Sequence, residues 1–365
     1  MDIAFTILLA LHGLIHLMGF AKAFGLAKLT ELSLTISRPA GMLWLTAGVF
    51  FFLAAAWFAS CSPLWRLFAL AGVVLSQGLI VAGWKDARWG TVANGLVVLA
   101  LVLSWGNQQF EGLWKRDVAA CTARVPKGPS GILQETDLQP LPALVRAYIR
   151  NSGAIGKPRP KGMRVVMDGQ MTGKGKPAFP FTCEQYSFFD QPARLFFMKG
   201  RMMGTSVPGY HRYMDGRAVM DIRLFGLLRL VHHEGPVMDT TELVTYFNDL
   251  CLMAPAALAD PRISWEQVDS LRVRARYTLN NVSISAVLIF NERAEIADFI
   301  SDDRTNVEEN KRMRFSTPVH SYGSFNGMKL VERGDAVWEY PEGPFTYGQF
   351  HIREISYTMP LFENH

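Results

Sequence analysis

Cysteine is scarce in this sequence, and the cysteines that are present form no recognisable pair. The chain of 365 residues contains four of them, Cys61, Cys121, Cys183 and Cys251. No two are separated by only two residues, as a zinc ribbon or a thioredoxin-like site would require. We therefore expect the four cysteines to serve as small buried hydrophobic residues.

Charge is also low, and it is not concentrated in one place. Charged residues make up 19% of the chain, and the net charge of +5 is not gathered in a polybasic tract. A protein that binds nucleic acid normally carries a basic face or stripe. The sequence therefore argues against a nucleic-acid partner.

Motifs that would identify an enzyme are missing. The segment Gly173–Ala178 imitates a dinucleotide-binding loop, but Pro177 and Pro180 oppose the helix that such a loop must start. In the segment Gly204–Gly209, Pro208 stands where a nucleophile elbow needs its second glycine. We assign no catalytic residue, no metal ligand and no cofactor from the sequence.

Two polar clusters keep an alternative open. His232 and His233 precede a glutamate and are either a strand-end pair or part of a metal site completed by a distant carboxylate. A second cluster is either a salt-bridged turn or the rim of a site, and it contains Asp298, Asp302, Asp303 and Arg304.

Long apolar runs, by contrast, fill the first 108 residues. There are four of them: Ile3–Ala21, Pro39–Ala59, Leu64–Trp84 and Thr91–Asn107. Because a bilayer core of ~30 Å requires about 20 apolar residues per helix, residues 1–110 are predicted to form a four-helix transmembrane bundle. The first run has only Asp2 as a charged residue before Lys22, so we expect a retained helix and not a cleaved signal peptide.

Polar residues within this block predict a hydrogen-bonded network. His12 and His16 are four residues apart and therefore share one helical face. Polar groups inside a bilayer usually face the bundle interior, so we expect both histidines to meet polar groups of the other helices there, with Gln77 and Asn94 as candidates. Asp86, in the third loop, completes the predicted polar network and is expected to pair with Lys85 or Arg88 or to cap the fourth helix. Three roles stay open: a structural pair, an incomplete metal or haem site, and a proton or substrate pathway.

Positive charges in the short loops predict the orientation. Five lysines and arginines lie in the first and third loops, against three near the span ends on the opposite side. The positive-inside rule then places the first and third loops in the cytoplasm. We expect a multi-pass protein of a bacterial inner membrane, with its soluble part on the periplasmic side.

The rest of the chain has a different composition. Residues 111–142 contain prolines and glycines and are predicted to be a linker, followed by a soluble domain over residues 143–365. The clearest strand pair is Leu271–Leu279 with Val282–Phe290, in which apolar and polar residues alternate. Alternation of this kind is typical of an antiparallel sheet with one buried face. We therefore predict an α+β domain, a curved antiparallel sheet covered by one or two helices.

The same alternation selects candidate ligand-binding residues. Asp239 and Glu242 have the spacing of a capping box at the start of a helix that would cover the sheet. We expect one helix residue and six strand residues to line an incompletely filled groove: Phe247, Val273, Ala275, Tyr277, Ile284, Ala286 and Leu288. The 16 methionines either fill the core or provide an adaptable apolar surface.

Several segments resemble a bacterial membrane-anchored family of unknown function. They are Leu11–His16, Ser37–Pro39, Trp84–Asp86, Glu242–Phe247 and Ile263–Trp265. The soluble part of that family resembles the lipoprotein-carrier (LolA/LolB) fold. The resemblance implies a half-barrel that is closed by helices and holds acyl chains.

Three functional hypotheses follow. The first is a membrane-anchored envelope protein whose half-barrel binds a lipid or another apolar ligand, with membrane lipids or a lipidated protein as partners. The second is an enzyme acting on lipid through Asp302, Arg304 or the pair His232–His233. The third is a redox or transport bundle centred on the intramembrane histidines.

Overall fold

The computed structural model describes residues 2–29 and 32–358. The chain divides into two compact units, Met1–Gln108 and Gln109–His365. One helix, Gly90–Arg124, has residues in both of them.

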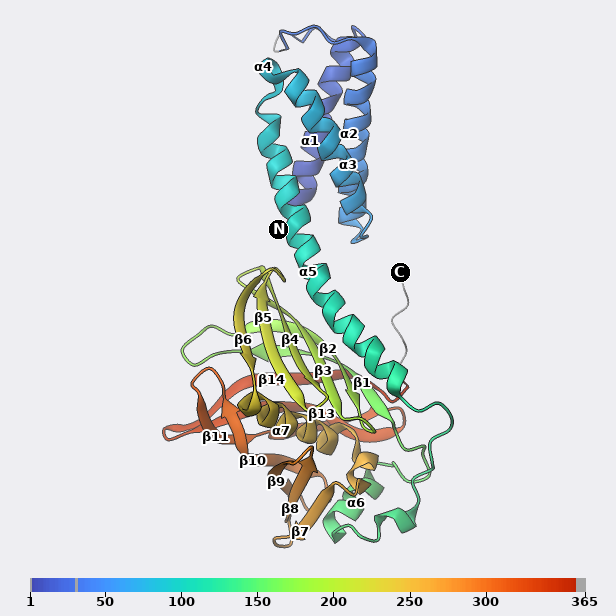
Figure 1. Cartoon of the computed structure of the whole chain (residues 1–365), viewed down its shortest axis with the longest axis vertical. Coiled ribbons are helices and arrows are strands. Elements are labelled where there is room, and N and C mark those ends of the chain that lie inside the picture. The colour runs from blue at the N-terminus through green and yellow to red at the C-terminus, as the bar shows by residue number, and fades with distance from the viewer. Residues whose placement is uncertain (1, 30–31, 359–365) are drawn as a thin grey trace. The chain divides into compact units, whose positions relative to one another are not determined.

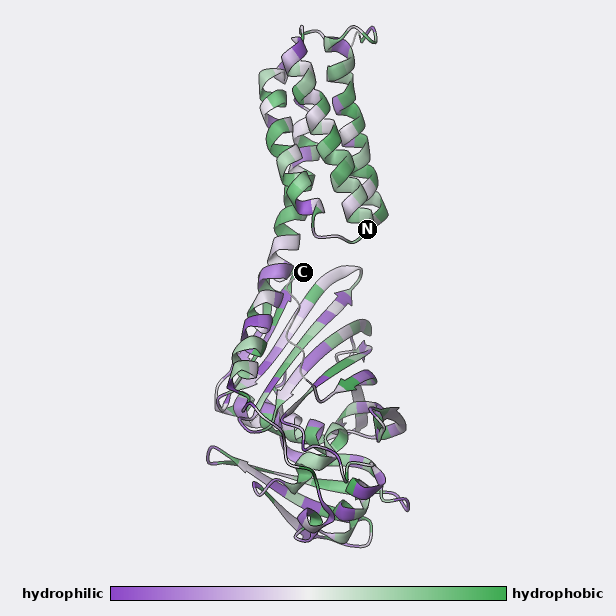
Figure 2. Ribbon diagram, turned by 90° about the vertical axis from the view of Figure 1, so that its right-hand side faces the viewer, coloured by the Kyte–Doolittle hydropathy of each residue, from purple (hydrophilic) through white to green (hydrophobic). Residues whose placement is uncertain are grey.

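The first unit is a bundle of apolar helices, and it appears mostly hydrophobic in Figure 2. Its helices are α1 (Asp2–Ala23), α2 (Arg38–Ala59), α3 (Trp65–Ala82), the short α4 (Trp84–Ala87) and the first part of α5 (Gly90–Arg124). The four long helices have the length and composition needed to cross a membrane, as the sequence predicted. They indicate a membrane anchor.

Close approach of α1 and α2 depends on glycine. A Cβ atom on Gly19 would lie 2.3 Å from the ring of Trp44, and a Cβ atom on Gly13 would lie 3.0 Å from the carbonyl oxygen of Gly48. Small residues at such positions let apolar helices pack backbone to backbone, where lipid offers no hydrophobic driving force. This packing brings the histidines of α1 close to α2.

The second unit is a half-barrel formed by one curved antiparallel sheet, with helix α7 against its inner side (Figure 1). Its helical elements are η1 (Glu135–Leu138), α6 (Ala143–Asn151), α7 (Pro236–Met253) and η2 (Pro255–Ala259). The strands are β1 (Gly162–Met171), β2 (Phe179–Phe188), β3 (Ala193–Met202), β4 (Thr205–Met214), β5 (Arg217–Leu224), β6 (Leu228–Glu234), β7 (Ile263–Gln267), β8 (Arg272–Leu279), β9 (Val282–Phe290), β10 (Ile296–Asn306), β11 (Lys311–Ser316), β12 (Val319–Phe325), β13 (Met328–Tyr340) and β14 (Gly343–Ser356). This confirms the predicted fold class.

Sheet order differs from chain order at the point that shapes the half-barrel. The strands follow the order β6-β5-β4-β3-β2-β1-β14-β13-β11-β10-β9-β8-β7, and β12 pairs with β13 outside this path. The last strand, β14, is therefore placed between β1 and β13. It joins the two halves of the sheet, and α7 contacts strands of both halves.

The segment after residue 110 differs from the predicted linker. Helix α5 continues to Arg124, and within the second unit it covers the outer side of β2, β3 and β4. Trp114 is 1% exposed, its indole Nε1 donates to the carbonyl oxygen of Leu195 at 3.1 Å, and its ring stacks on Phe197. The strands under this helix segment are consequently buried on both faces.

Replacing Trp114 by alanine should destabilise the second unit by about 3–5 kcal/mol, because the change leaves a large cavity and removes a buried hydrogen bond. In thermal unfolding of the full chain, the midpoint of the second unit should fall by on the order of 10 °C. The matched control is Trp105→Ala on the same helix, where the side chain is 55% exposed. Equal effects of both changes on the second unit would contradict this role of Trp114.

Candidate functional site

Helix α7 is tied to the sheet by acidic side chains on its inner face. The helix begins at Pro236, after Gly235 with a φ of 97°. Asp239 Oδ1 accepts a hydrogen bond of 2.6 Å from the backbone N–H of Ala218 on β5. The predicted capping box is wrong, because Asp239 and Glu242 lie inside the helix and face strands instead of its own first turn.

A buried ion network continues this attachment. Arg194 on β3 donates to Asp249 Oδ2 at 2.7 Å and to Glu242 Oε2 at 3.1 Å. His211 Nδ1 lies 2.9 Å from Glu242 Oε1, and Gln185 Nε2 donates to Asp249 Oδ2 at 2.9 Å. The Arg194 guanidinium and both α7 carboxylates are thus hydrogen-bonded to one another or to neighbouring strands. Buried charges are tolerated only when they are paired in this way.

The pKa of Glu242 shows how strongly its neighbours in the network stabilise the ionised carboxylate. Burial, the largest effect, would raise the pKa of this carboxyl group. The hydrogen bond and charge of His211, with the charges of Arg194 and Arg304, outweigh burial and lower the pKa to about 2. Glu242 therefore stays ionised in the folded protein down to acidic pH.

Beside this network lies a partly open cavity of about 130 Å³. It is enclosed by α7 and by the inner side of β1–β4, β10, β11, β13 and β14. Its apolar side chains include Met167, Met171, Phe196, Leu252, Phe350 and Ile352. Its polar end is formed by Gln185, Arg194, His211, Asn248, Asp249 and Arg304. A mostly apolar hollow with a few convergent polar groups is the usual form of a small-molecule site.

Arg304 enters the cavity from β10 and lies among aromatic rings. Its guanidinium carbon is 4.1 Å from the centre of the Phe315 ring, 5.1 Å from that of Trp338 and 5.8 Å from that of Tyr347. It also donates a hydrogen bond to the Tyr347 hydroxyl group. Cation–π contacts of this kind stabilise a desolvated guanidinium without neutralising its charge.

A β-bulge directs Arg304 inward. Ser301 pairs with Phe315 and Arg304 with Met313, so β10 has one residue more than β11 between these pairs. Without the bulge, Asp302 and Arg304 would share one face; with it, Asp302 pairs with exposed Arg314 on the outer side at 2.9 Å. The sequence contained no signal for this bulge. All four polar residues of the predicted cluster near residue 300 lie within β10, so the predicted turn is wrong, and of the four only Arg304 lines the cavity.

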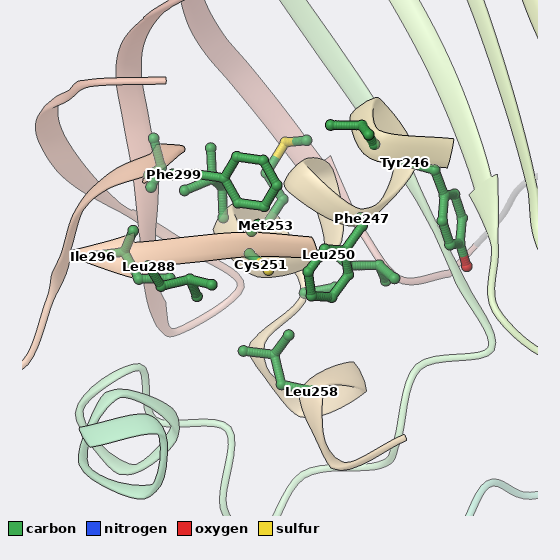
Figure 3. Packing of buried hydrophobic residues seen from close by; sticks show 14 of the residues in the cluster. Tyr246, Phe247, Leu250, Cys251, Met253, Leu258, Leu288, Ile296 and Phe299 are labelled. Carbon is green, nitrogen blue, oxygen red and sulfur yellow. The ribbon is translucent and has the colours of Figure 1, made fainter. Parts of the chain in front are cut away.

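The seven predicted ligand-binding residues lie together, but in a closed core. Their side chains are at most 2% exposed, and Phe247 stacks on Tyr277 at 5.3 Å between ring centres. Figure 3 shows Phe247 and Leu288 packed among Phe299, Leu250 and Ile296. None of the seven lines the 130 Å³ cavity, which lies on the other side of α7. Their role as ligand contacts stays an untested prediction.

The predicted polar residues of the membrane bundle are largely brought together. His12 Nε2 lies 2.9 Å from Asn94 Oδ1, and the Asn94 amide donates to Gln77 Oε1 and to Ser76 Oγ, each at 3.0 Å. His16 Nδ1 lies 2.8 Å from the carbonyl oxygen of His12. These contacts support the structural role among the three considered. The metal, haem and transport roles stay untested.

Asp86 is not part of that network. Its carboxylate accepts from Ser33 Oγ at 2.7 Å and from the backbone N–H of Leu34 at 2.8 Å. These hydrogen bonds lower the pKa of Asp86 and tie the α1–α2 loop to α4. Asp86 therefore lies on α4, and its partners are in the α1–α2 loop instead of the predicted Lys85, Arg88 or helix cap.

The histidine pair His232–His233 lies at the end of strand β6. His232 lies 3.6 Å from the exposed carboxylate of Glu234, on a strand at the sheet edge. Within residues 2–29 and 32–358, no three His, Cys, Asp or Glu side chains are placed to share a metal ion.

A larger hollow of about 580 Å³ lies at the surface near residues 126–161. Two of its three lysines already have partners in the chain: Lys157 donates to two carbonyl oxygens of the β12–β13 turn, and Lys161 donates to those of Pro126 and Gly128. These contacts fasten the segment to the sheet. We therefore regard the cavity beside α7, and not this groove, as the candidate site.

Replacing Glu242 by glutamine should destabilise the second unit by about 3 kcal/mol at pH 7, because Arg194 would lose one of its two buried anionic partners. The lowered pKa of Glu242 means that this stabilisation is complete above its ordinary pKa of 4.5 and disappears as pH falls through about 2. Unfolding measured from pH 7 to pH 2 should show the gap between variant and wild type closing below pH 4.5. Exposed Glu339 provides the control, Glu339→Gln. A gap that is constant with pH would contradict the ionised network.

Solved structures of two bacterial proteins resemble about half of this chain. A domain described as an outer-membrane lipoprotein-sorting protein from Vibrio parahaemolyticus is similar over 56% of this chain and 88% of its own, with 9% identity and a TM-score of 0.33. A beta-barrel-like protein of the domain of unknown function DUF1849 from Brucella abortus is similar over 54% and 98%, with 9% identity and a TM-score of 0.19. Both scores are below 0.5, so neither similarity supports a functional conclusion. No curated protein matches the chain.

One family model matches most of the second unit. It covers residues 131–350, more than half of the chain, and it describes a family whose function is unknown. The matched segment includes α7, strands β1–β13 with the first part of β14, and every cavity-lining residue except Ile352. The chain therefore belongs to the family of unknown function DUF6544.

Proposed function

We propose that this protein is a membrane-anchored binding protein whose half-barrel holds an apolar or amphipathic ligand in the cavity beside α7. The observation that carries the proposal is the cavity itself: a hollow on the inner side of the sheet, lined by methionine, leucine and aromatic side chains, next to a densely packed core. A folded domain normally fills such space, because empty apolar cavities cost stability.

The size of the cavity limits what it holds in this state. A volume of about 130 Å³ is close to that of engineered cavities that bind a single benzene ring. A short alkyl group fits directly. A longer acyl chain requires movement of the lining, for which the flexible side chains of Met167, Met171 and Met253 are well suited.

The membrane helices supply the second part of the proposal. An anchor keeps the binding unit near the bilayer, where apolar ligands are concentrated. The excess of positive charge in the first and third loops favours a periplasmic half-barrel in a bacterial inner membrane. Membrane lipids or a lipidated protein are the partners that fit this location.

Narrowing the cavity tests ligand binding. Ala336 on β13 lines the cavity, so Ala336→Phe should reduce binding of an environment-sensitive fatty-acid probe by tenfold or more, with only a small change in unfolding temperature. The control is Val287→Phe on the opposite, outer face of β9, which should bind like wild type. If wild type binds no probe, or if both variants bind it equally well, the proposal fails.

Fusion reporters test the orientation. A phosphatase joined after His365 should be active, and a fluorescent protein that matures only in the cytoplasm should stay dark at the same position. The same two reporters placed in the first loop should give the opposite results. An inactive phosphatase and a bright fluorescent protein at the C-terminus would place the half-barrel in the cytoplasm.

A further inference from the structure

Unpaired polar atoms gather in the cavity. Among the described residues, seven buried side-chain polar atoms have no hydrogen-bond partner. Four of the seven belong to cavity-lining residues: Gln185 Oε1, Asn248 Oδ1, Arg304 Nε and Thr317 Oγ1. An unpaired buried polar atom costs about 1–3 kcal/mol, so four of them in one place indicate a surface that is completed by another molecule.

The carboxylates at this end of the cavity are already satisfied. Glu242 is bonded to Arg194 and His211, and Asp249 to Arg194 and Gln185. Neither is available for a cationic ligand. Two further charged residues line the cavity. The carboxylate of Asp335 is paired with His320 Nε2 at 3.0 Å. Arg304 influences Glu242 electrostatically but forms no ion pair with any described carboxylate.

The aromatic rings around Arg304 hold its guanidinium in place and leave part of its hydrogen-bonding capacity unused. Its Nη1 reaches Tyr347, while Nε has no acceptor. A guanidinium edge is well shaped for the oxygens of a carboxylate or phosphate. The Thr317 hydroxyl group and the Asn248 amide line the same cavity and can also donate to a ligand, the amide by turning to present its NH2 group.

We infer that the ligand is an anionic amphiphile whose carboxylate or phosphate binds Arg304 and whose alkyl part lies against the methionine and aromatic lining. This inference rests on the proposed function and names the ligand class for the same cavity. Gln185 Oε1 is fixed as an acceptor, since its amide nitrogen donates to Asp249. It accepts from a hydroxyl group of the ligand or from a water beside it.

The test compares four amphiphiles with one eight-carbon chain: octanoate, octyl phosphate, octanol and octyltrimethylammonium. Native mass spectrometry of the detergent-solubilised full chain, with the amphiphiles in competition, gives the relative affinities. Each of the two anions should bind at least about tenfold more tightly than octanol, because its charged group adds a hydrogen bond to the Arg304 guanidinium. A preference for octanoate over octyl phosphate indicates a fatty acid, and the reverse preference indicates a phosphate-bearing lipid.

Variants of Arg304 connect the preference to this side chain. Arg304→Gln should lower anion binding to the level of octanol and leave octanol binding unchanged, and Arg304→Lys should restore part of the preference. Arg312→Gln on the exposed side of β11 is the matched control and should bind like wild type. The unfolding temperature of each variant shows whether it is folded, and the wild-type comparison stands without any variant.

The outcomes separate the two proposals. If wild type binds none of the four amphiphiles, the proposed binding function fails. If it binds octanol and the anions equally, or prefers the ammonium compound, the binding function stands and the anion assignment is overturned. If anions are preferred but Arg304→Gln keeps that preference, the assignment to Arg304 is overturned.

Discussion

The buried ion network between α7 and β3 is the constraint on which the half-barrel depends. Arg194 links Glu242 and Asp249, two carboxylates on one face of α7 and about two turns apart, and so fixes the helix along its length. Ion pairs out of water have a large desolvation cost that only complete hydrogen bonding offsets. The helix therefore has one favourable position against the sheet. That position closes the β8–β9 side into a packed core and leaves the β1–β14–β13 side open as a cavity.

The division of the inner face into a packed part and an open part explains the character of the site. On the packed part, Phe247 and Tyr277 stack and every side chain is sealed. On the open part, methionines meet a polar end built from the same network that holds the helix. Structural attachment and the proposed ligand recognition thus share residues, so Arg194, Glu242 and Asp249 are poor choices for separating the two. Arg304 is outside the ion pairs and is the better probe of recognition.

The sequence correctly predicted the strands that have one face exposed to solvent. The β8–β9 pair alternates cleanly because its outer arginines stay in solvent, and both strands lie close to their predicted limits. Strand β2 was missed because α5 covers its outer face, so Tyr186 and Phe188 are buried where alternation would require polar residues. The extension of α5 was missed for a related reason: its apolar stripe is short and lies within a charged segment.

The site was harder to predict than the fold, because it depends on long-range geometry. Local spacing assigned Glu242 to a helix cap, whereas its partners Arg194 and His211 are 48 and 31 residues away. Arg304 faces inward only because of a bulge that the sequence does not signal. The alternation at β8 and β9 did identify which side chains point inward, but it could not show that the covering helix would seal them completely instead of leaving a groove.

The most direct measurement is the identity of the small molecules that copurify with the full chain. The protein would be purified in detergent and washed extensively with fresh detergent to remove loosely bound lipid. It would then be denatured, and the small molecules that it releases would be compared by mass spectrometry with the bulk lipid extract of the same membranes. The account predicts one class of anionic alkyl or acyl compound, enriched over the bulk and near one molecule per chain. An extract with the composition of the bulk lipids, or with no retained amphiphile after washing, would contradict it.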